Sequence, residues 1–257
     1  MPAYNRFVKF KFETSNDKLK MNDNNLIKVL FYSETNTLLS NYLTKDKSLS
    51  NFLKQNIENN SVNTCMVRSE KGTYLLIKRK DNEIELTHKY LEDLGGKIFN
   101  KTKFMGCPEV RIYENNQDFI KQIALGILLG SYKFDNYKKN KSKEIIDIKY
   151  VTFISDEAKK HSQVLQEIRN IAHGVFTARD LVWQPPNILF PLSFANECKR
   201  LKKIGVKVTI YNEKHLEKIG MEALLAVGRG SRKDSQVVVL EWLGGTKGSS
   251  PMAFIGK

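Results

Sequence analysis

The chain has 257 residues, and its 42 Lys and Arg residues against 28 Asp and Glu residues give a formal net charge of +14. A hydrophobic fraction of 41%, with 10% aromatic residues, is sufficient for a buried core and excludes an intrinsically disordered protein. The three cysteines are widely spaced and form no Cys-x-x-Cys pair, which argues against a disulfide framework and a structural zinc knuckle.

The first part of the chain alternates between strand-like and helix-like segments. Residues 1–25 are polar, and we expect them to be loosely ordered. In chain order, we then predict a buried strand at 26–32, a strand at 73–78, a helix at 83–99, a strand at 109–113, a buried helix at 118–132 and a strand at 146–154. Gly95 and Gly96 are expected to interrupt the first helix near its end. The alternation favours an α/β domain with a mostly parallel sheet.

A long helix is predicted to follow this domain. Ser155 is a suitable N-cap residue, and two acidic residues follow it in the first turn. Apolar residues recur at helical spacing as far as residue 181, and the helix must end before Pro185, because proline cannot continue a helix. We expect this helix to link two domains. The predicted division is residues 1–154, 155–182 and 183–257.

The last part of the chain reads as the beginning of a second α/β domain. We predict a helix at 193–204, a strand at 206–211, a short helix at 213–219, a buried strand at 236–242 and a strand at 252–255. These residues are too few for a comfortable core of their own. We therefore expect an incomplete catalytic domain that belongs to a longer protein.

Most local signatures of catalysis are absent from the sequence. The four histidines lack His-Glu-x-x-His spacing, and neither a Gly-x-Ser-x-Gly elbow nor a phosphate-binding loop is found. Gly228 and Gly230 form a Gly-x-Gly, but Lys233 stands where a third glycine of a dinucleotide site would fall. A tight turn is the preferred interpretation. Cys198 lies on an amphipathic segment with no catalytic motif beside it and is interpreted as a packing residue.

Four sequence blocks resemble the leucyl aminopeptidase (cytosol aminopeptidase) family of two-metal exopeptidases, in the same order and with the same spacing. The blocks are GILLGSYKFDNY at 126–137, TARDLVWQPPN at 177–187, IGMEALLAVGRGS at 219–231 and PMAFIGK at 251–257. The resemblance is good over residues 120–257 and holds only in outline over residues 25–120. It implies an N-terminal domain followed by the first strands of a catalytic domain.

The resemblance also implies a mechanism in which two divalent metal ions activate a water that attacks the first peptide bond of a substrate. Manganese or zinc is expected, with magnesium or cobalt as further possibilities. Lys257 corresponds to the first metal-ligand lysine of the family. A lysine amine binds a metal only when neutral, although its usual pKa is about 10.4, and neighbouring dications favour loss of the proton. A solvated lysine with no ligand role is the alternative for Lys257.

The remaining family ligands and the catalytic arginine would lie beyond residue 257, so we expect no catalytic residue within this chain. We therefore predict that these 257 residues alone have no peptidase activity, whereas a complete protein would release N-terminal residues from peptides during intracellular peptide turnover. The resemblance further implies a homohexamer. Two alternatives stay open, which are a DNA-binding accessory protein and an inert remnant that joins a hexamer.

The positive charge is compatible with the DNA-binding alternative, because Lys and Arg that neutralise phosphates supply most non-specific affinity. However, only residues 138–143 form a dense basic cluster, and lysines greatly outnumber arginines. Enrichment in Lys, Asn and Ile together favours a compositional bias of the coding sequence. The longest apolar run, residues 123–130, is far shorter than the roughly 18–20 residues of a membrane span. We expect a soluble cytoplasmic protein with no membrane partner.

Overall fold

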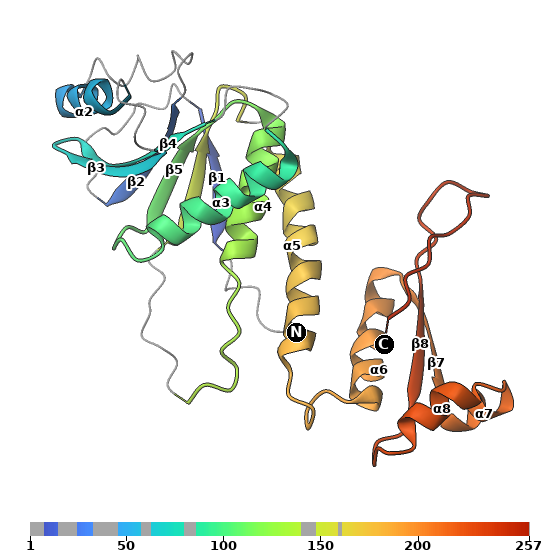
Figure 1. Ribbon diagram of the computed structural model, residues 1–257. Helices are drawn as coiled ribbons and strands as arrows, with labels where there is room; N and C mark the ends of the chain where they lie inside the picture. The colour runs from blue at the N-terminus through green and yellow to red at the C-terminus, as the bar shows by residue number, and fades with distance from the viewer. Residues whose placement is uncertain are drawn as a thin grey trace. The chain divides into compact units, whose positions relative to one another are not determined.

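The computed structural model describes residues 8–14, 25–32, 46–57, 63–79, 86–139, 148–158 and 161–256 (Figure 1). The chain divides into two compact units, Met1–Arg179 and Asp180–Lys257. The predicted division into two domains and a linker helix, at residues 154 and 182, stays a prediction.

The first unit is built on a six-stranded sheet with the strand order β1-β6-β5-β2-β4-β3. Its strands are β1 (Lys9–Glu13), β2 (Leu26–Tyr32), β3 (Thr64–Ser69), β4 (Gly72–Lys78), β5 (Glu109–Tyr113) and β6 (Tyr150–Ile154). All neighbouring strands are parallel except β3 and β4. Every residue of β2 is buried, as expected for a central strand of a parallel sheet. The predicted α/β fold with a mostly parallel sheet is confirmed.

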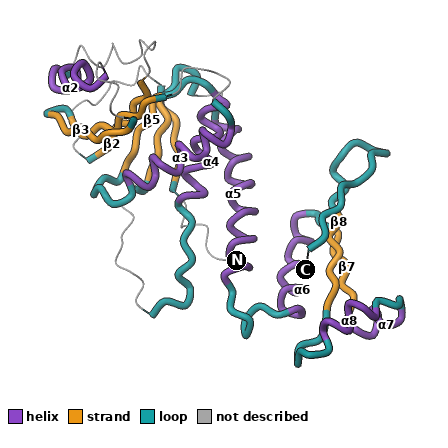
Figure 2. The backbone as a smooth tube through the Cα atoms, in the orientation of Figure 1, coloured by secondary structure: helices purple, strands orange, loops and turns teal. Residues whose placement is uncertain are grey.

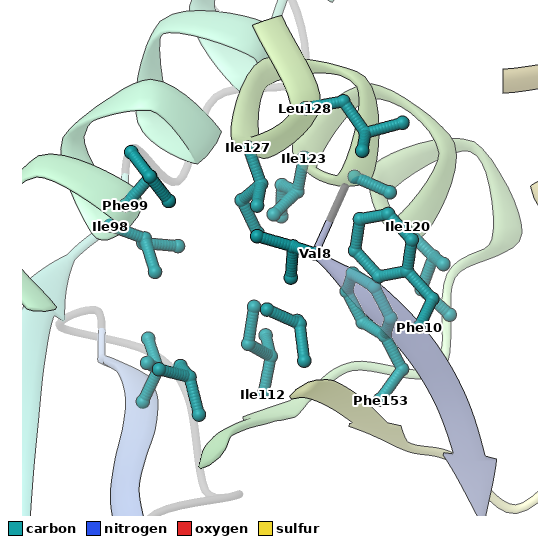
Figure 3. Close-up of a cluster of buried hydrophobic side chains, with 14 of the residues drawn as sticks. Val8, Phe10, Ile98, Phe99, Ile112, Ile120, Ile123, Ile127, Leu128 and Phe153 are labelled. Atoms are coloured by element: carbon teal, nitrogen blue, oxygen red, sulfur yellow. The ribbon is translucent and has the colours of Figure 1, made fainter. Parts of the chain in front are cut away.

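Helices α3 (His88–Thr102), α4 (Gln117–Gly130) and α5 (Ser162–Trp183) contribute apolar side chains to the main core of this unit. Strand β5 alternates, so that Val110 and Ile112 are fully buried in this core. Figure 3 shows Ile112 and Phe153 from the sheet together with Ile120 and Ile123 from α4. The predicted buried helix at 118–132 is therefore confirmed as α4, one residue longer at its start and two shorter at its end.

Helix α2 (Lys47–Ile57) contributes Leu49 to a second, smaller apolar cluster. This cluster also contains Leu30 of β2 and Leu76 of β4. Asp46 precedes this helix, and its carboxylate accepts hydrogen bonds from the backbone N–H of Leu49 (3.1 Å) and from the hydroxyl of Ser69 (2.6 Å). Burial acts to raise the pKa of Asp46, but these hydrogen bonds outweigh it and lower that pKa. Asp46 therefore caps the helix as a carboxylate.

Because the pKa of Asp46 is lower in the folded than in the unfolded protein, its contribution to stability is complete above the unfolded value of about 3.9 and is lost as the pH falls below it. Asp46→Asn keeps a capping oxygen but removes this titration. We expect the free energy of unfolding to fall less steeply between pH 5 and pH 2 in Asp46→Asn than in the wild type, measured by urea unfolding. Equal slopes would contradict this role.

The second unit is built around an antiparallel pair of strands. Its elements are α6 (Pro191–Lys199), a 3₁₀ helix (Arg200–Ile204), β7 (Lys207–Asn212), α7 (Glu213–Lys218), α8 (Glu222–Gly228) and β8 (Gln236–Glu241). Within this unit α6 runs beside the β7–β8 pair (Figure 2). Gly205 ends the 3₁₀ helix with φ of +91°, a left-handed conformation that favours glycine. The predicted helix at 193–204, the strand at 206–211 and the short helix at 213–219 are confirmed with small shifts of their ends.

Two predictions about the N-terminal half were wrong. Residues 1–25 are not entirely loosely ordered, because β1 lies within them and pairs with β6. Its sequence KFKFE alternates, and Phe10 stacks on Phe153 with ring centroids 5.9 Å apart. Gly95 and Gly96 do not interrupt α3, which runs on to Thr102. Gly95 instead allows α4 to lie close against α3, because a Cβ at this position would overlap the carbonyl oxygen of Ile123.

The predicted start of the long helix at Ser155 was also wrong, because α5 begins at Ser162. The Ser155 hydroxyl accepts a hydrogen bond from the backbone N–H of Glu157 (3.3 Å) and lies 3.1 Å from Nε2 of His161. This local turn competes with helix formation, as serine side chains often do.

Two predictions about strands in the second unit were wrong as well. The strand expected at 236–242 exists as β8, but it is only half-buried. No strand forms at 252–255, where the side chains of Met252, Phe254 and Ile255 are 81–100% exposed. Both departures have the same physical reason, which is a lack of neighbouring strands. Among the described residues, β8 pairs only with β7, and residues 251–256 pair with no strand.

Candidate metal centre

Lys257, the predicted metal ligand, lies outside the described residues. The segment that leads to it, residues 251–256, forms neither helix nor strand and is exposed throughout. The role of Lys257 therefore stays a prediction.

The described part of the chain contains no group of three or more His, Cys, Asp or Glu side chains that could hold a metal ion. Several carboxylates of the second unit are engaged in other contacts. Glu241 lies 2.8 Å from the ammonium of Lys207, and this hydrogen bond raises the pKa of Lys207. Glu213 accepts a hydrogen bond from the backbone N–H of Ser235 (2.8 Å). These side chains hold the β7–β8 unit together and do not converge on a metal site.

Two of the four histidines, His161 and His215, have structural surroundings. His161 is buried, and its ring lies 5.7 Å from the ring of Phe12. Its Nδ1 atom has no hydrogen-bond partner among the described residues. The ring of His215 packs edge-on against Tyr211, with centroids 4.8 Å apart. Neither arrangement gathers a second donor of the kind that a metal ion needs.

All three cysteines, Cys65, Cys107 and Cys198, are free thiols. Burial is the main cause that raises the pKa of Cys65, and burial followed by the nearby Glu197 raises the pKa of Cys198. A raised thiol pKa disfavours the reactive thiolate. The interpretation of Cys198 as a packing residue is therefore supported by its surroundings.

Two of the four sequence blocks contact each other within the first unit. The guanidinium of Arg179, from the block at 177–187, donates a hydrogen bond to the backbone carbonyl of Leu129 (2.9 Å) in the block at 126–137. The same guanidinium lies over the ring of Tyr132, 5.3 Å from its centroid, and Tyr132 in turn packs against Phe176. These contacts join the end of α4 to α5, so both blocks have a structural role here.

The third block, residues 219–231, forms the turns around α8. Gly220 has φ of +75° after α7, which favours glycine. A Cβ on Gly228 would overlap the hydroxyl of Ser235, and the backbone N–H of Ser231 donates to the carbonyl of Gly228 (2.9 Å). The preferred interpretation of this Gly-x-Gly as a tight turn is confirmed.

Sequence comparison identifies relatives for this chain. The profile of the catalytic domain of the cytosol aminopeptidase family matches residues 176–257. A probable cytosol aminopeptidase of Agrobacterium fabrum is 44% identical over 160 residues, which are 60% of this chain and 31% of that protein. One of Rickettsia africae is 30% identical over 248 residues, which are 89% of this chain and 50% of that protein.

Solved structures share the fold. A tomato leucine aminopeptidase mutant superposes with a TM-score of 0.72 at 16% identity, over 91% of this chain and 50% of that chain. The bottromycin maturation enzyme BotP in complex with Mn superposes with a TM-score of 0.61 at 16% identity, over 85% of this chain and 45% of that chain. In every one of these matches, the chain spans half or less of the protein that it resembles.

Proposed function

Because this chain belongs to the cytosol aminopeptidase family, we propose that it is the N-terminal part of a metal-dependent leucyl aminopeptidase that releases N-terminal amino acids from peptides. The observation that carries the proposal is the match of residues 176–257 to the family's catalytic domain. The first unit then serves as the N-terminal domain, and residues 183–257 begin the catalytic domain.

We propose two divalent metal ions for the complete enzyme, manganese or zinc first, with magnesium or cobalt also suitable as ions for nitrogen and oxygen ligands. The Mn-bound relative BotP supports a metal of this kind. The described residues do not provide the ligands for such a pair, and one amine, that of Lys257, cannot hold two dications. The other ligands must come from polypeptide that corresponds to the rest of the relatives' length, and no step of hydrolysis is assigned to the described residues.

The activity of the chain tests this proposal. We expect no release of p-nitroaniline from leucyl-p-nitroanilide by the purified chain with added Mn²⁺. We expect Mn²⁺-dependent release when the chain is extended, in one polypeptide, by the C-terminal remainder of the Agrobacterium fabrum relative. Lys257→Ala should abolish the activity of the extended protein, whereas Lys247→Ala, an exposed lysine of the same unit, should leave it unchanged. Metal-dependent turnover by the chain alone, if Lys257→Ala removed it, would contradict the proposal that this chain lacks a complete metal centre.

We further propose a homohexamer of the complete protein and a cytoplasmic location, which is supported by the name cytosol aminopeptidase of its relatives. In the described residues, no helix combines the length and the apolar character that crossing a membrane would require. The alternative of a DNA-binding accessory protein also stays a prediction. It requires duplex binding that weakens steeply as salt is raised, and no binding at low salt would contradict it.

A further inference from the structure

Lysines gather at the edge of the first unit's sheet where its parallel strands begin. The neighbouring strands β1, β6 and β5 run parallel, so their first residues lie at one edge. Strand β1 starts at Lys9, and Lys149 directly precedes β6. The backbone N–H of Lys9 donates a hydrogen bond to the carbonyl of Lys149 (3.0 Å), and both residues are exposed. Two neighbouring strands therefore bring two exposed lysines to this edge.

The loop between α3 and β5 adds two more lysines. Lys101 is exposed in the last turn of α3, and Lys103 follows as the C-cap residue of the helix. The carbonyl of Pro108, at the end of the loop, accepts a hydrogen bond from the backbone N–H of Lys149 (2.8 Å). This hydrogen bond ties the loop to the start of β6, so the lysines of the loop and of the strands share one edge.

Phe104 belongs to the same loop and is 54% exposed. The ammonium of Lys103 lies 5.0 Å from the centroid of the Phe104 ring and donates a hydrogen bond to Oδ1 of Asn100 (2.9 Å). Met105, the next residue, packs against the main core. An exposed aromatic ring is therefore held beside a cation, on a loop that is anchored in the core. We call this surface the basic edge, and its residues are Lys9, Lys101, Lys103, Phe104 and Lys149.

The positive charge of the basic edge is not neutralised by carboxylates. Within the described residues, none of its four lysines forms an ion pair with Asp or Glu. Glu109, the first residue of β5, accepts hydrogen bonds from Nε of Arg111 (2.9 Å) and from the hydroxyl of Thr152 (2.7 Å). The charge of Glu109 is therefore used within the sheet, and the basic edge keeps an excess of positive charge.

A second basic segment leaves the first unit at the end of α4. A Cβ on Gly130, the last residue of α4, would lie 3.5 Å from the ring of Phe99, so α4 ends beside the last turn of α3. Figure 1 shows the following loop leaving the end of α4. In this loop, Tyr137 is 54% exposed, and Lys138 and Lys139 are exposed. These lysines are the first residues of the dense basic cluster noted in the sequence.

A membrane surface that carries negative charge has the chemistry that matches the basic edge. Lysine ammonium groups are attracted as point charges to anionic lipid headgroups, and aromatic rings favour the interface between headgroups and acyl chains. Recognition of nucleic acids relies more on arginine, whose planar fork pairs with phosphates and base edges, and the basic edge contains no arginine. We propose that the basic edge is a docking surface for membranes that contain anionic lipids.

This inference goes beyond the proposed function and does not depend on it. The sequence predicted no membrane partner because its longest apolar run is too short to span a bilayer. Binding at the surface of a membrane requires clustered charge and a small number of apolar side chains instead of a spanning segment. The basic edge provides the charge through its lysines and the apolar contact through Phe104.

Co-sedimentation with lipid vesicles tests the proposal on the purified 257-residue chain. We expect at least tenfold more chain to sediment with vesicles of phosphatidylcholine and phosphatidylserine than with vesicles of phosphatidylcholine alone. Binding should weaken as salt is raised, because ions screen exposed charges. Equal sedimentation with both kinds of vesicle would overturn the proposal.

Charge reversal tests the location of the surface. The double variant Lys101→Glu/Lys103→Glu should lower binding to the phosphatidylserine vesicles at least tenfold. The matched control is Lys214→Glu/Lys218→Glu, which makes the same change of charge at two exposed lysines of α7 in the second unit. This control should change binding less than twofold. Equal losses in the two double variants would show that only net charge matters, and the basic edge would not be the docking surface.

Phe104→Ala tests the aromatic contact. This variant should lower binding at least threefold and leave the circular dichroism spectrum unchanged, because Phe104 is exposed. Unchanged binding would contradict the proposed surface, of which Phe104 is a part.

Competition with a DNA duplex separates a lipid partner from a nucleic-acid partner. The duplex should not displace the chain from the phosphatidylserine vesicles. Displacement by a duplex whose binding is lost in Lys101→Glu/Lys103→Glu would assign the basic edge to nucleic acid and overturn the lipid partner. None of these measurements uses peptide hydrolysis, so their outcome is independent of the aminopeptidase activity.

Discussion

Replacement of Phe153 by alanine is expected to lower the free energy of unfolding of the first unit by about 3–5 kcal/mol, the usual loss for removal of a buried aromatic ring. Phe153 is fully buried in β6, near the edge of the sheet. Its ring lies 5.9 Å from the rings of both Phe10 and Phe12 of β1. Figure 3 shows the side chains of Phe10 and Phe153 beside each other. Removal of the ring leaves a cavity and loosens the pairing of β1 with β6. Urea unfolding followed by circular dichroism measures the change.

Phe104→Ala is the matched control for this prediction. Phe104 is also a phenylalanine of the first unit, but it is 54% exposed. A surface substitution of this kind usually changes stability by less than about 0.5 kcal/mol. Equal losses for the two variants would mean that Phe153 is not a core residue, and the arrangement of β1 on β6 would then be in doubt.

The strands that the sequence predicts most accurately are those in which hydrophobic burial alone decides the structure. Residues 26–32 and 109–113 were predicted with the bounds of β2 and β5. β2 is buried along its whole length, and β5 alternates cleanly between buried and half-buried residues. In both strands the local pattern and the tertiary environment demand the same structure, so the pattern is a reliable guide.

The errors arise where a distant segment decides the outcome. Strand β1 is short and charged, and its place in the sheet depends on β6, which lies more than 130 residues later. The start of α5 depends on the side chain of Ser155, which contacts its own turn and His161. An alternation of Val8, Phe10 and Phe12 was present in the sequence and could have revealed β1.

For the candidate centre, the sequence provided the family resemblance and one predicted ligand, Lys257, whose role stays a prediction. It could not show that Arg179 reaches the carbonyl of Leu129, because the two residues are 50 positions apart and only the fold brings them together. It also predicted burial of β8, which follows correctly from an apolar run but requires neighbouring segments that the described residues do not include. The burial pattern and the length of the relatives together explain this disagreement.

The packing of α3 against α4 leads to the second large effect, which is expected for Gly126→Ala. A Cβ on Gly126 would overlap the carbonyl oxygen of Glu92, and one on Gly95 would overlap the carbonyl oxygen of Ile123. These atoms belong to the backbone, so the clash is relieved only if the two helices move apart. Overpacking of a core costs 1–3 kcal/mol or more, and we expect a loss near the upper end, about 3 kcal/mol.

Gly96→Ala provides a control on the same helix pair. A Cβ on Gly96 would meet only the carbonyl oxygen of Gly126, at 3.9 Å, which is an ordinary contact. Alanine is favoured over glycine inside a helix by up to about 1 kcal/mol, so this variant should be unchanged or more stable. Opposite signs for two Gly→Ala changes, measured by urea unfolding, would distinguish steric exclusion from helix propensity. A stabilising Gly126→Ala would show that the helices do not approach as closely as the structure places them.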